Sequence, residues 1–208
     1  MYAIVTDGSI SRYVNHPKAI TIGDVQYPAK IFSVWSKSEL NAIGIYEVTF
    51  DDSNKKDDNW YNNTNQTFTY NASAGTVTAA YGTATAKAHA DTLWTQADSD
   101  NGDLPFDKSV GDVKVEGLKT VLIKTIKSQA AGELQNTDWY VVRKADAGTA
   151  VPSAITTHRA AVRTKVAEME TAIINAADTP ALEALYAYTE QEDGSVTRPL
   201  GELPELES

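Results

Sequence analysis

One apolar stripe after Pro152 constrains the fold of this chain more than any other feature. Its members follow one another at spacings of seven, four, three and four residues, the period of a single helix face: Ile155, Val162, Val166, Met169 and Ile173. Pro152 suits the first turn of such a helix, and Ser153 is a capping residue type beside it. Asp178 and Thr179 indicate the start of a second, shorter helix. The sequence therefore predicts a helical hairpin whose stripe either packs inside the chain or contacts another subunit.

The first 50 residues alternate between apolar and polar side chains over short runs, as half-buried strands do. The pair Asp7-Gly8 supplies the tight turn of a hairpin that opens the chain. Further short strands are expected at residues 9–14, 20–22, 25–27 and 45–50. These runs predict a small antiparallel sheet at the N-terminus.

A short helix interrupts this sheet. Ser36 and Glu39 have the S-x-x-E spacing of a capping box, in which each residue satisfies a free backbone N–H of the other. Trp35 and Leu40 occupy the two positions of a hydrophobic staple around it. Gly44 lies where a left-handed residue would end a helix of about two turns.

The middle of the chain, residues 51–116, reads as rich in β-structure. After a polar loop, residues 67–80 have the alternation of a hairpin, with four side chains expected on one face: Phe68, Tyr70, Val77 and Ala79. Helices are expected at residues 82–97 and 117–134, separated by an acidic turn.

The predicted fold class is α+β, with four regions. A small N-terminal antiparallel sheet module with a short helix (1–50) is followed by the β-rich middle (51–116), a helical region with a C-terminal helical hairpin (117–188) and an acidic tail (189–208). The tail carries one basic residue, Arg198, against six acidic ones: Glu190, Glu192, Asp193, Glu202, Glu205 and Glu207. We expect this tail to be solvated or to meet a basic partner.

Composition excludes several classes of function. The 208 residues include no cysteine, so the chain has no disulfide framework and no thiolate metal site. The formal net charge of −10 opposes binding to nucleic acid and to anionic lipid. Asp7 and Arg12 interrupt the first residues before a long apolar run develops, so the sequence predicts neither a signal peptide nor a membrane span there.

No motif of catalysis or of cofactor binding is present in the sequence. The three histidines, His16, His89 and His158, are too far apart in sequence to place two on one helical face. The sequence contains no nucleophile elbow, no P-loop and no dinucleotide fingerprint. We therefore expect no metal, no cofactor and no enzymatic activity, and we expect the chain to act through binding.

Three segments resemble the small accessory tail proteins of tailed bacteriophages. They are the opening MYAIVTDG, the middle WYNNTNQTFTYNASAGTVTAAY and, above all, TDWYVVRKADAGTAVPSAITTHRAAVR followed by PLGELPEL. The likeness is closest over residues 137–163. Proteins similar to this include tail-fibre assembly chaperones and small structural components of the tail, fibre or baseplate.

The resemblance implies protein–protein contact with a phage tail fibre or other tail protein, and it is compatible with a homo-oligomer. As a fibre assembly or capping protein the chain would work in the host cytoplasm, and as a structural component it would remain in the virion tail. If the chaperone likeness holds, it implies that the C-terminal region contacts the fibre, through Arg198, Pro199 and Leu200. Unlike many such chaperones, the chain has no tryptophan in this region.

Two arginines on the long predicted helix are further candidates for partner contact. Arg159 and Arg163 are one turn apart, so both guanidinium groups could bind carboxylates of a partner in bidentate fashion, or both could be exposed helix charges. The apolar run from Trp139 to Val142, by contrast, is expected to be core.

An aromatic pair gives a rival function from another class. Trp60 and Tyr61 stand in an asparagine-rich polar loop and are expected to be exposed. Since aromatic faces stack on sugars, the pair would suit a host-surface carbohydrate-binding module.

Overall fold

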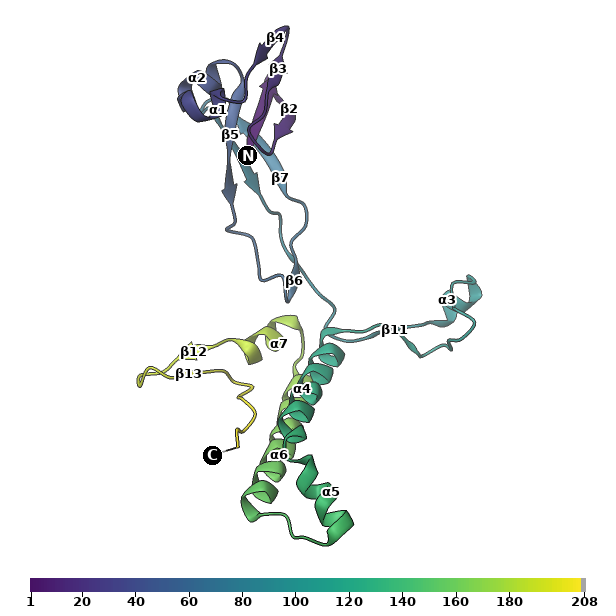
Figure 1. Cartoon of the computed structure of the whole chain (residues 1–208). Helices are drawn as coiled ribbons and strands as arrows, with labels where there is room; N and C mark the ends of the chain where they lie inside the picture. Colours follow the sequence, from purple (N-terminus) through teal and green to yellow (C-terminus); the bar gives the residue numbers. More distant parts are fainter. Residues whose placement is uncertain (207–208) are drawn as a thin grey trace. The chain divides into compact units, whose positions relative to one another are not determined.

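The computed structural model describes residues 1–206, and the chain divides into two units, residues 1–85 and residues 86–208 (Figure 1). The mixture of an N-terminal sheet, a β-rich middle and C-terminal helices confirms the predicted α+β class. Each unit has its own elements and is described separately below. No helix within residues 1–206 is long and apolar enough to cross a membrane.

Unit 1 is built on a five-stranded sheet with the order β2-β1-β5-β8-β7. Its strands are β1 (Tyr2–Thr6), β2 (Ser9–Val14), β5 (Ile45–Asp51), β7 (Thr67–Asn71) and β8 (Thr76–Ala80). Neighbours are antiparallel except β5 and β8, which run parallel. Because β5 pairs with β8, the predicted boundary between residues 50 and 51 falls inside one sheet. The hairpins at residues 2–14 and 67–80 are confirmed.

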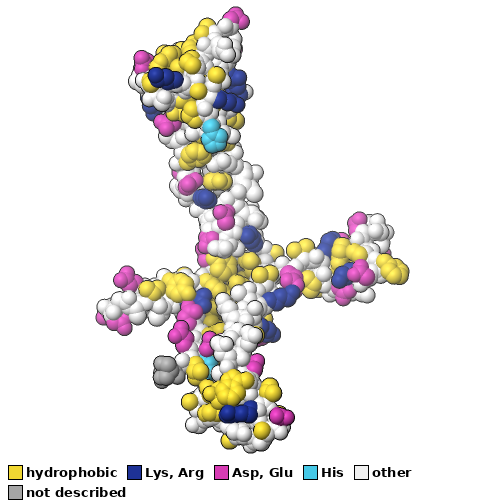
Figure 2. Space-filling view, viewed as in Figure 1, with side chains coloured by type: hydrophobic (Ala, Val, Ile, Leu, Met, Phe, Trp, Pro, Cys, Tyr) yellow, Lys and Arg dark blue, Asp and Glu magenta, His cyan; other side chains and the backbone are white. Residues whose placement is uncertain are grey.

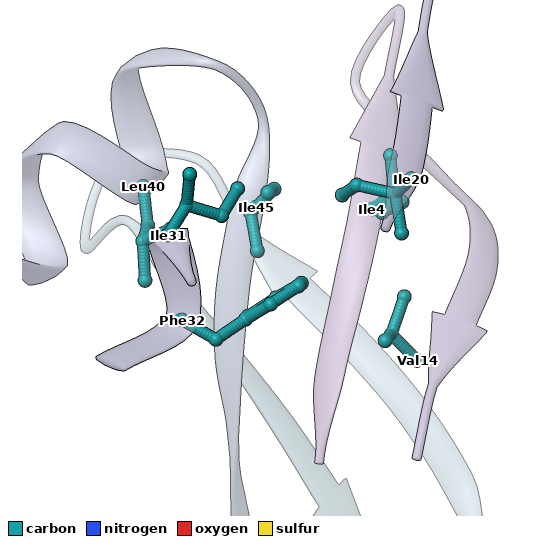
Figure 3. Close-up of a cluster of buried hydrophobic side chains, with 7 residues drawn as sticks. All are labelled: Ile4, Val14, Ile20, Ile31, Phe32, Leu40 and Ile45. Carbon is teal, nitrogen blue, oxygen red and sulfur yellow. The ribbon is translucent and has the colours of Figure 1, made fainter. Parts of the chain in front are cut away.

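One face of this sheet is covered by two short helices and a small hairpin. Helix α1 (Ile31–Val34), helix α2 (Lys37–Ala42) and the hairpin β3 (Ile20–Ile22) to β4 (Val25–Tyr27) lie over it. Figure 3 shows the buried side chains that this layer and the sheet contribute to one cluster: Ile4, Val14, Ile20, Ile31, Phe32, Leu40 and Ile45. Their burial supplies the hydrophobic stabilisation of this half of the unit.

The local signals around α2 are confirmed in detail. The Ser36 hydroxyl accepts from the backbone N–H of Glu39 at 3.3 Å, and the Glu39 carboxylate accepts from the backbone N–H of Ser36 at 2.7 Å. Hydrogen bonds from the Ser36 side chain and backbone lower the pKa of Glu39 below its ordinary value. Gly44 ends the helical turn with φ of 81°. Its carbonyl accepts from Val5 N–H at 2.8 Å, which ties the turn to β1.

The other face of the sheet buries a second cluster, formed by Ala3, Val48, Val77 and Ala79 with Phe68 and Tyr70 beside them. The four side chains predicted on one face of the 67–80 hairpin are therefore together. A bulge at Ser11 shifts the register between β1 and β2. The edge strands approach one another there, and the Tyr13 and Phe68 rings lie 4.7 Å apart. The sheet thus curls around this cluster. Unit 1 ends with the two-stranded pairing of β6 (Tyr61–Asn62) and β9 (Thr85–Ala86).

The prediction of a helix at residues 82–97 is wrong. Most of this segment is extended, and only the short helix α3 (Gln96–Asp100) overlaps its end. The carbonyl groups of Ala88 and His89 accept hydrogen bonds from Leu118 and Lys119 N–H at 2.9 and 3.0 Å. The extended chain therefore satisfies free N–H groups at the start of the next helix, which a helical conformation here could not do. This tertiary role overrides the weak local preference.

Residues 91–117 form a two-stranded hairpin that carries α3, here called the 91–117 hairpin. Strand β10 (Thr92–Leu93) pairs with β11 (Val113–Val115). The Asp98 carboxylate accepts from Lys114 Nζ and caps α3 through Thr95, and Lys114 Nζ also lies 4.4 Å from the centre of the Trp94 ring. These contacts hold the hairpin together in place of an apolar core.

Because of the Asp98–Lys114 ion pair, we expect the stability of the 91–117 hairpin to depend on pH. The hydrogen bonds from Lys114 and Thr95 lower the pKa of Asp98 far below its ordinary value of 3.8. A lowered carboxylate pKa stabilises the hairpin above about pH 4, and this contribution is lost as the pH falls through the folded-state pKa. With fluorotryptophan at position 94, we expect the fluorine NMR signal to stay constant above about pH 4 and to shift as the pH falls from about 4 to about 1. In the Asp98→Asn variant this acid shift should disappear, and an acid shift that persists in the variant would contradict the assignment.

The helices of unit 2 pack mainly as a pair, α4 (Leu118–Gln135) and α6 (Ser153–Asn175), with α7 (Thr179–Tyr186) shorter (Figure 1). The predicted helix at 117–134 is confirmed. Four of the five stripe residues are buried, namely Ile155, Val162, Met169 and Ile173. The stripe packs inside the chain, and its main partner is α4 instead of the α7 that the predicted hairpin required. Asp178 caps α7 by accepting from Ala181 N–H at 2.9 Å.

The predicted acidic tail has secondary structure of its own. It forms a small hairpin of β12 (Thr189–Glu190) and β13 (Val196–Thr197) and then returns to α7. Leu200 N–H donates to the Leu185 carbonyl at 3.0 Å, and the Leu200 side chain is 2% exposed. Leu200 therefore anchors the tail to unit 2. The last two residues of the predicted tail lie outside the described part of the chain.

Candidate protein-binding surface

Helix α5 (Asp138–Ala147) occupies the segment in which the resemblance is closest, and it is the least buried long helix of the structure. None of its residues is buried. Trp139 is 50% exposed and Val142 is 65% exposed, so the prediction that the run from Trp139 to Val142 is core is wrong. Gly148 ends the helix in the left-handed conformation, with φ of 70°. The helix leaves Trp139, Val141 and Val142 exposed to solvent.

A buried arginine fixes the start of α5. The guanidinium of Arg159, on α6, donates to the Leu134 carbonyl at 2.9 Å and to Thr137 Oγ1 at 2.6 Å. Its other terminal nitrogen lies 2.8 Å from Asp138 Oδ1. Arg159 is 8% exposed and Thr137 is 2% exposed. We call these four residues the Arg159 clamp. The clamp gives the Leu134 carbonyl, near the end of α4, a charged donor and orients the first turn of α5. The Arg159 side chain is therefore occupied by contacts within the chain.

The exposed side of α5 combines apolar and cationic side chains. Trp139, Val142 and Ala145 follow at spacings of three residues and share this side. The Trp139 and Tyr140 rings lie 3.8 Å apart, and the Arg143 guanidinium lies 4.6 Å from the centre of the Trp139 ring. Figure 2 shows hydrophobic side chains around Lys or Arg over this part of unit 2. We call Trp139, Val142, Ala145 and Arg143 the α5 face.

A groove of about 300 Å³ adjoins α5 where the chain turns into α6. Val141 and Val151 supply its apolar lining, Lys144 and Arg163 supply positive charge, and Arg159 reaches it from the clamp. Arg163 is exposed, and its guanidinium donates a single long hydrogen bond within residues 1–206, to the Arg159 carbonyl at 3.5 Å. Within residues 1–206, neither Lys144 nor Arg163 forms an ion pair. We call this site the basic groove, and its two cations are available to carboxylates.

The predicted contacts at the C-terminus are largely engaged within the chain. Arg198 Nε donates to the Gly201 carbonyl at 3.1 Å, and Arg198 forms an ion pair with Glu202 at 2.7 Å. Its guanidinium also lies 5.4 Å from the centre of the Tyr188 ring. With Leu200 buried, Pro199 is the exposed member of the predicted trio. The structure thus brings this segment against α7, where the Arg198 guanidinium lies 5.1 Å from the centre of the Tyr186 ring.

The aromatic pair proposed for carbohydrate binding is not exposed. Trp60 is 8% exposed and Tyr61 is 5% exposed, so the expectation of an exposed pair is wrong. Lys56 Nζ lies 4.3 Å from the centre of the Tyr61 ring. A sugar stacks on an open ring face, which this pair does not offer.

Within residues 1–206, no three or more histidine, cysteine, aspartate or glutamate side chains lie together so that they could hold a metal ion.

No protein-family model, curated protein or solved structure matches this chain.

Proposed function

We propose that this chain is a non-catalytic binding protein that holds a partner protein on the α5 face, and that the partner is a tail fibre or another tail protein, as the resemblance implies. One observation carries this proposal: the Arg159 clamp orients a helix whose tryptophan and valine remain in solvent. Tryptophan, tyrosine and arginine dominate the energetics of protein interfaces. A fixed orientation lowers the entropy lost when a partner binds.

The amount of accessible surface favours a place in a larger assembly. The chain exposes 13293 Å². A compact monomer of 22.5 kDa exposes roughly 9,500 Å², and two separate compact units of this total mass expose roughly 11,000 Å². Surface in excess of both values suits a structural component of the tail, which is the second candidate function. Both candidates require protein contact.

The proposal is tested by co-expression with candidate phage tail-fibre and tail proteins. In the double variant Trp139→Ser, Val142→Ser, we expect the amount of co-purified partner to fall at least about tenfold, because interface anchors contribute upwards of 1 kcal/mol each. The control is Val121→Ser, which removes a valine that is 45% exposed on α4. Equal co-purification by the double variant and the wild type would overturn the proposal.

The two candidate functions differ in what purified particles contain. A fibre assembly protein makes its partner soluble and is absent from the particle, whereas a structural component is retained in fixed stoichiometry. Quantitative mass spectrometry of purified virions separates the two.

A further inference from the structure

We infer that the basic groove receives a second copy of this chain, with Phe106 of one copy inserted between Val141 and Val151 of the other. This inference uses residues outside the α5 face, so it stands independently of the proposed function. It commits the groove to a self-association site.

The occupant is the tip of the 91–117 hairpin. Phe106 is fully exposed, with a relative accessibility of 107%. The Lys108 N–H donates to the Pro105 carbonyl at 3.0 Å, and this turn presents the phenylalanine. Asp103 and Asp107 lie on either side of the ring in sequence. The Asp107 side chain is 77% exposed, and its carboxylate lies 4.0 Å from Lys108 Nζ in a solvent-exposed pair. Two carboxylates therefore accompany one unburied aromatic side chain.

The groove has the complementary chemistry. Its volume of about 300 Å³ exceeds the roughly 150 Å³ of a cavity that holds a benzene ring, so an aromatic side chain fits. Its apolar lining suits the Phe106 ring, and the unpaired Lys144 and Arg163 suit the two carboxylates. The occupant supplies both the ring and the charges that the groove lacks.

Charge also favours this pairing over other contacts between copies. Residues 91–117 carry seven acidic and two basic residues, whereas residues 118–188 carry seven acidic and eight basic residues. Two acidic chains would otherwise repel one another. Docking the acidic hairpin on the groove joins the segments of opposite charge, so association through this contact opposes the repulsion between the chains.

The 91–117 hairpin itself gains from being covered. A two-stranded hairpin is only marginally stable alone. This one exposes Leu93 at 44%, Val113 at 42% and Val115 at 59%. Contact with a second copy would bury part of this apolar surface, and such burial is the usual driving force of association.

Sedimentation velocity of the full chain at about 100 μM tests the inference. We expect the wild type to sediment as an oligomer. The single variant Phe106→Asp and the double variant Lys144→Glu with Arg163→Glu should each sediment as monomers. The first variant retains an intact groove and the second an intact tip. An equimolar mixture of the two should therefore regain a complex with one copy of each. Phe50→Asp, at an aromatic residue 55% exposed in unit 1, is the control and should remain an oligomer.

A monomeric wild type, an oligomer that persists in both variants, or a mixture that stays monomeric would each overturn the inference. Circular dichroism verifies that the exposed substitutions leave both variants folded. The Phe106→Asp variant should still co-purify a tail partner through the α5 face. Failure of self-association is thereby distinguished from failure of the proposed function.

Discussion

Alanine in place of Arg159 is expected to destabilise unit 2 by about 2–3 kcal/mol. The substitution removes the charged donor that the Leu134 carbonyl and Thr137 Oγ1 share, and a hydrogen bond to a charged group contributes about 1.5–3 kcal/mol. The Leu134 carbonyl keeps the bonds from Thr137 N–H at 3.0 Å and from the Thr137 hydroxyl at 2.8 Å. The packing of the arginine stem is lost as well. Asp138 contributes less to the loss because its side chain is 57% exposed and regains water. Urea unfolding monitored by hydrogen exchange at amides of unit 2 measures the change in its free energy of unfolding.

Arg163→Ala is the matched control, because it removes the same side chain one turn along α6 at an exposed position. We expect it to change the stability by less than about 0.5 kcal/mol. Arg159→Lys should not restore wild-type stability, since a single ammonium cannot reproduce the fork that reaches Thr137 and Asp138. Equal effects of alanine at positions 159 and 163 would show that the clamp does not hold α5.

Gly44→Ala is expected to have the largest effect in unit 1. The backbone at Gly44 has φ of 81°, a conformation that costs a residue with a side chain about 1–3 kcal/mol. An added Cβ would also lie 2.6 Å from the Val5 carbonyl oxygen, which is backbone of the central sheet and cannot move aside. We expect a loss of at least about 3 kcal/mol in the stability of unit 1.

Gly23→Ala separates the two causes of that loss. Gly23 also has a positive φ, 57°, but a Cβ there meets nothing within 4 Å. Only the conformational cost, about 1–3 kcal/mol, applies to it. Hydrogen exchange should report the Gly44→Ala loss in residues 1–85 and little change in unit 2. A loss of Gly44→Ala no larger than that of Gly23→Ala would contradict the predicted clash.

The elements of unit 1 could be predicted from sequence because their local signals agree with their tertiary contacts. The Ser36–Glu39 capping box, the Gly44 stop and the 67–80 hairpin each depend on neighbours in sequence. The bulge at Ser11 had no such signal, so the faces of β2 could not be assigned. The parallel pairing of β5 with β8 also depends on contacts distant in sequence.

Unit 2 was predicted less well, for a physical reason that is visible in two segments. The 82–97 segment is extended because its carbonyls satisfy the N-terminus of α4, a partner about 30 residues away. Trp139 and Val142 were assigned to the core because apolar runs usually are, although Thr137-Asp138 before them and Gly148 after them mark the ends of a separate helix. Those end signals could have identified α5. Its exposure could not have been predicted, because burial depends on which helices pack together.

Among the residues proposed for partner contact, sequence reasoning identified the arginines but not their different situations. Arg159 and Arg163 look equivalent in sequence, being one turn apart on α6. Their environments differ because Thr137 and Asp138 reach only the first of them. Lys144, the second cation of the basic groove, had no sequence signal of its own.

Site-specific photo-crosslinking on α5 tests the central claim most directly. A benzophenone side chain placed at Val142, on the α5 face, and separately at Val121, on α4, probes two exposed valines of one unit. When each variant is co-expressed with candidate tail-fibre and tail proteins and irradiated, the proposed binding role of the α5 face predicts a covalent adduct with a tail protein from position 142 and none from position 121. No adduct from position 142, with the tail protein still co-purified, would contradict the claim.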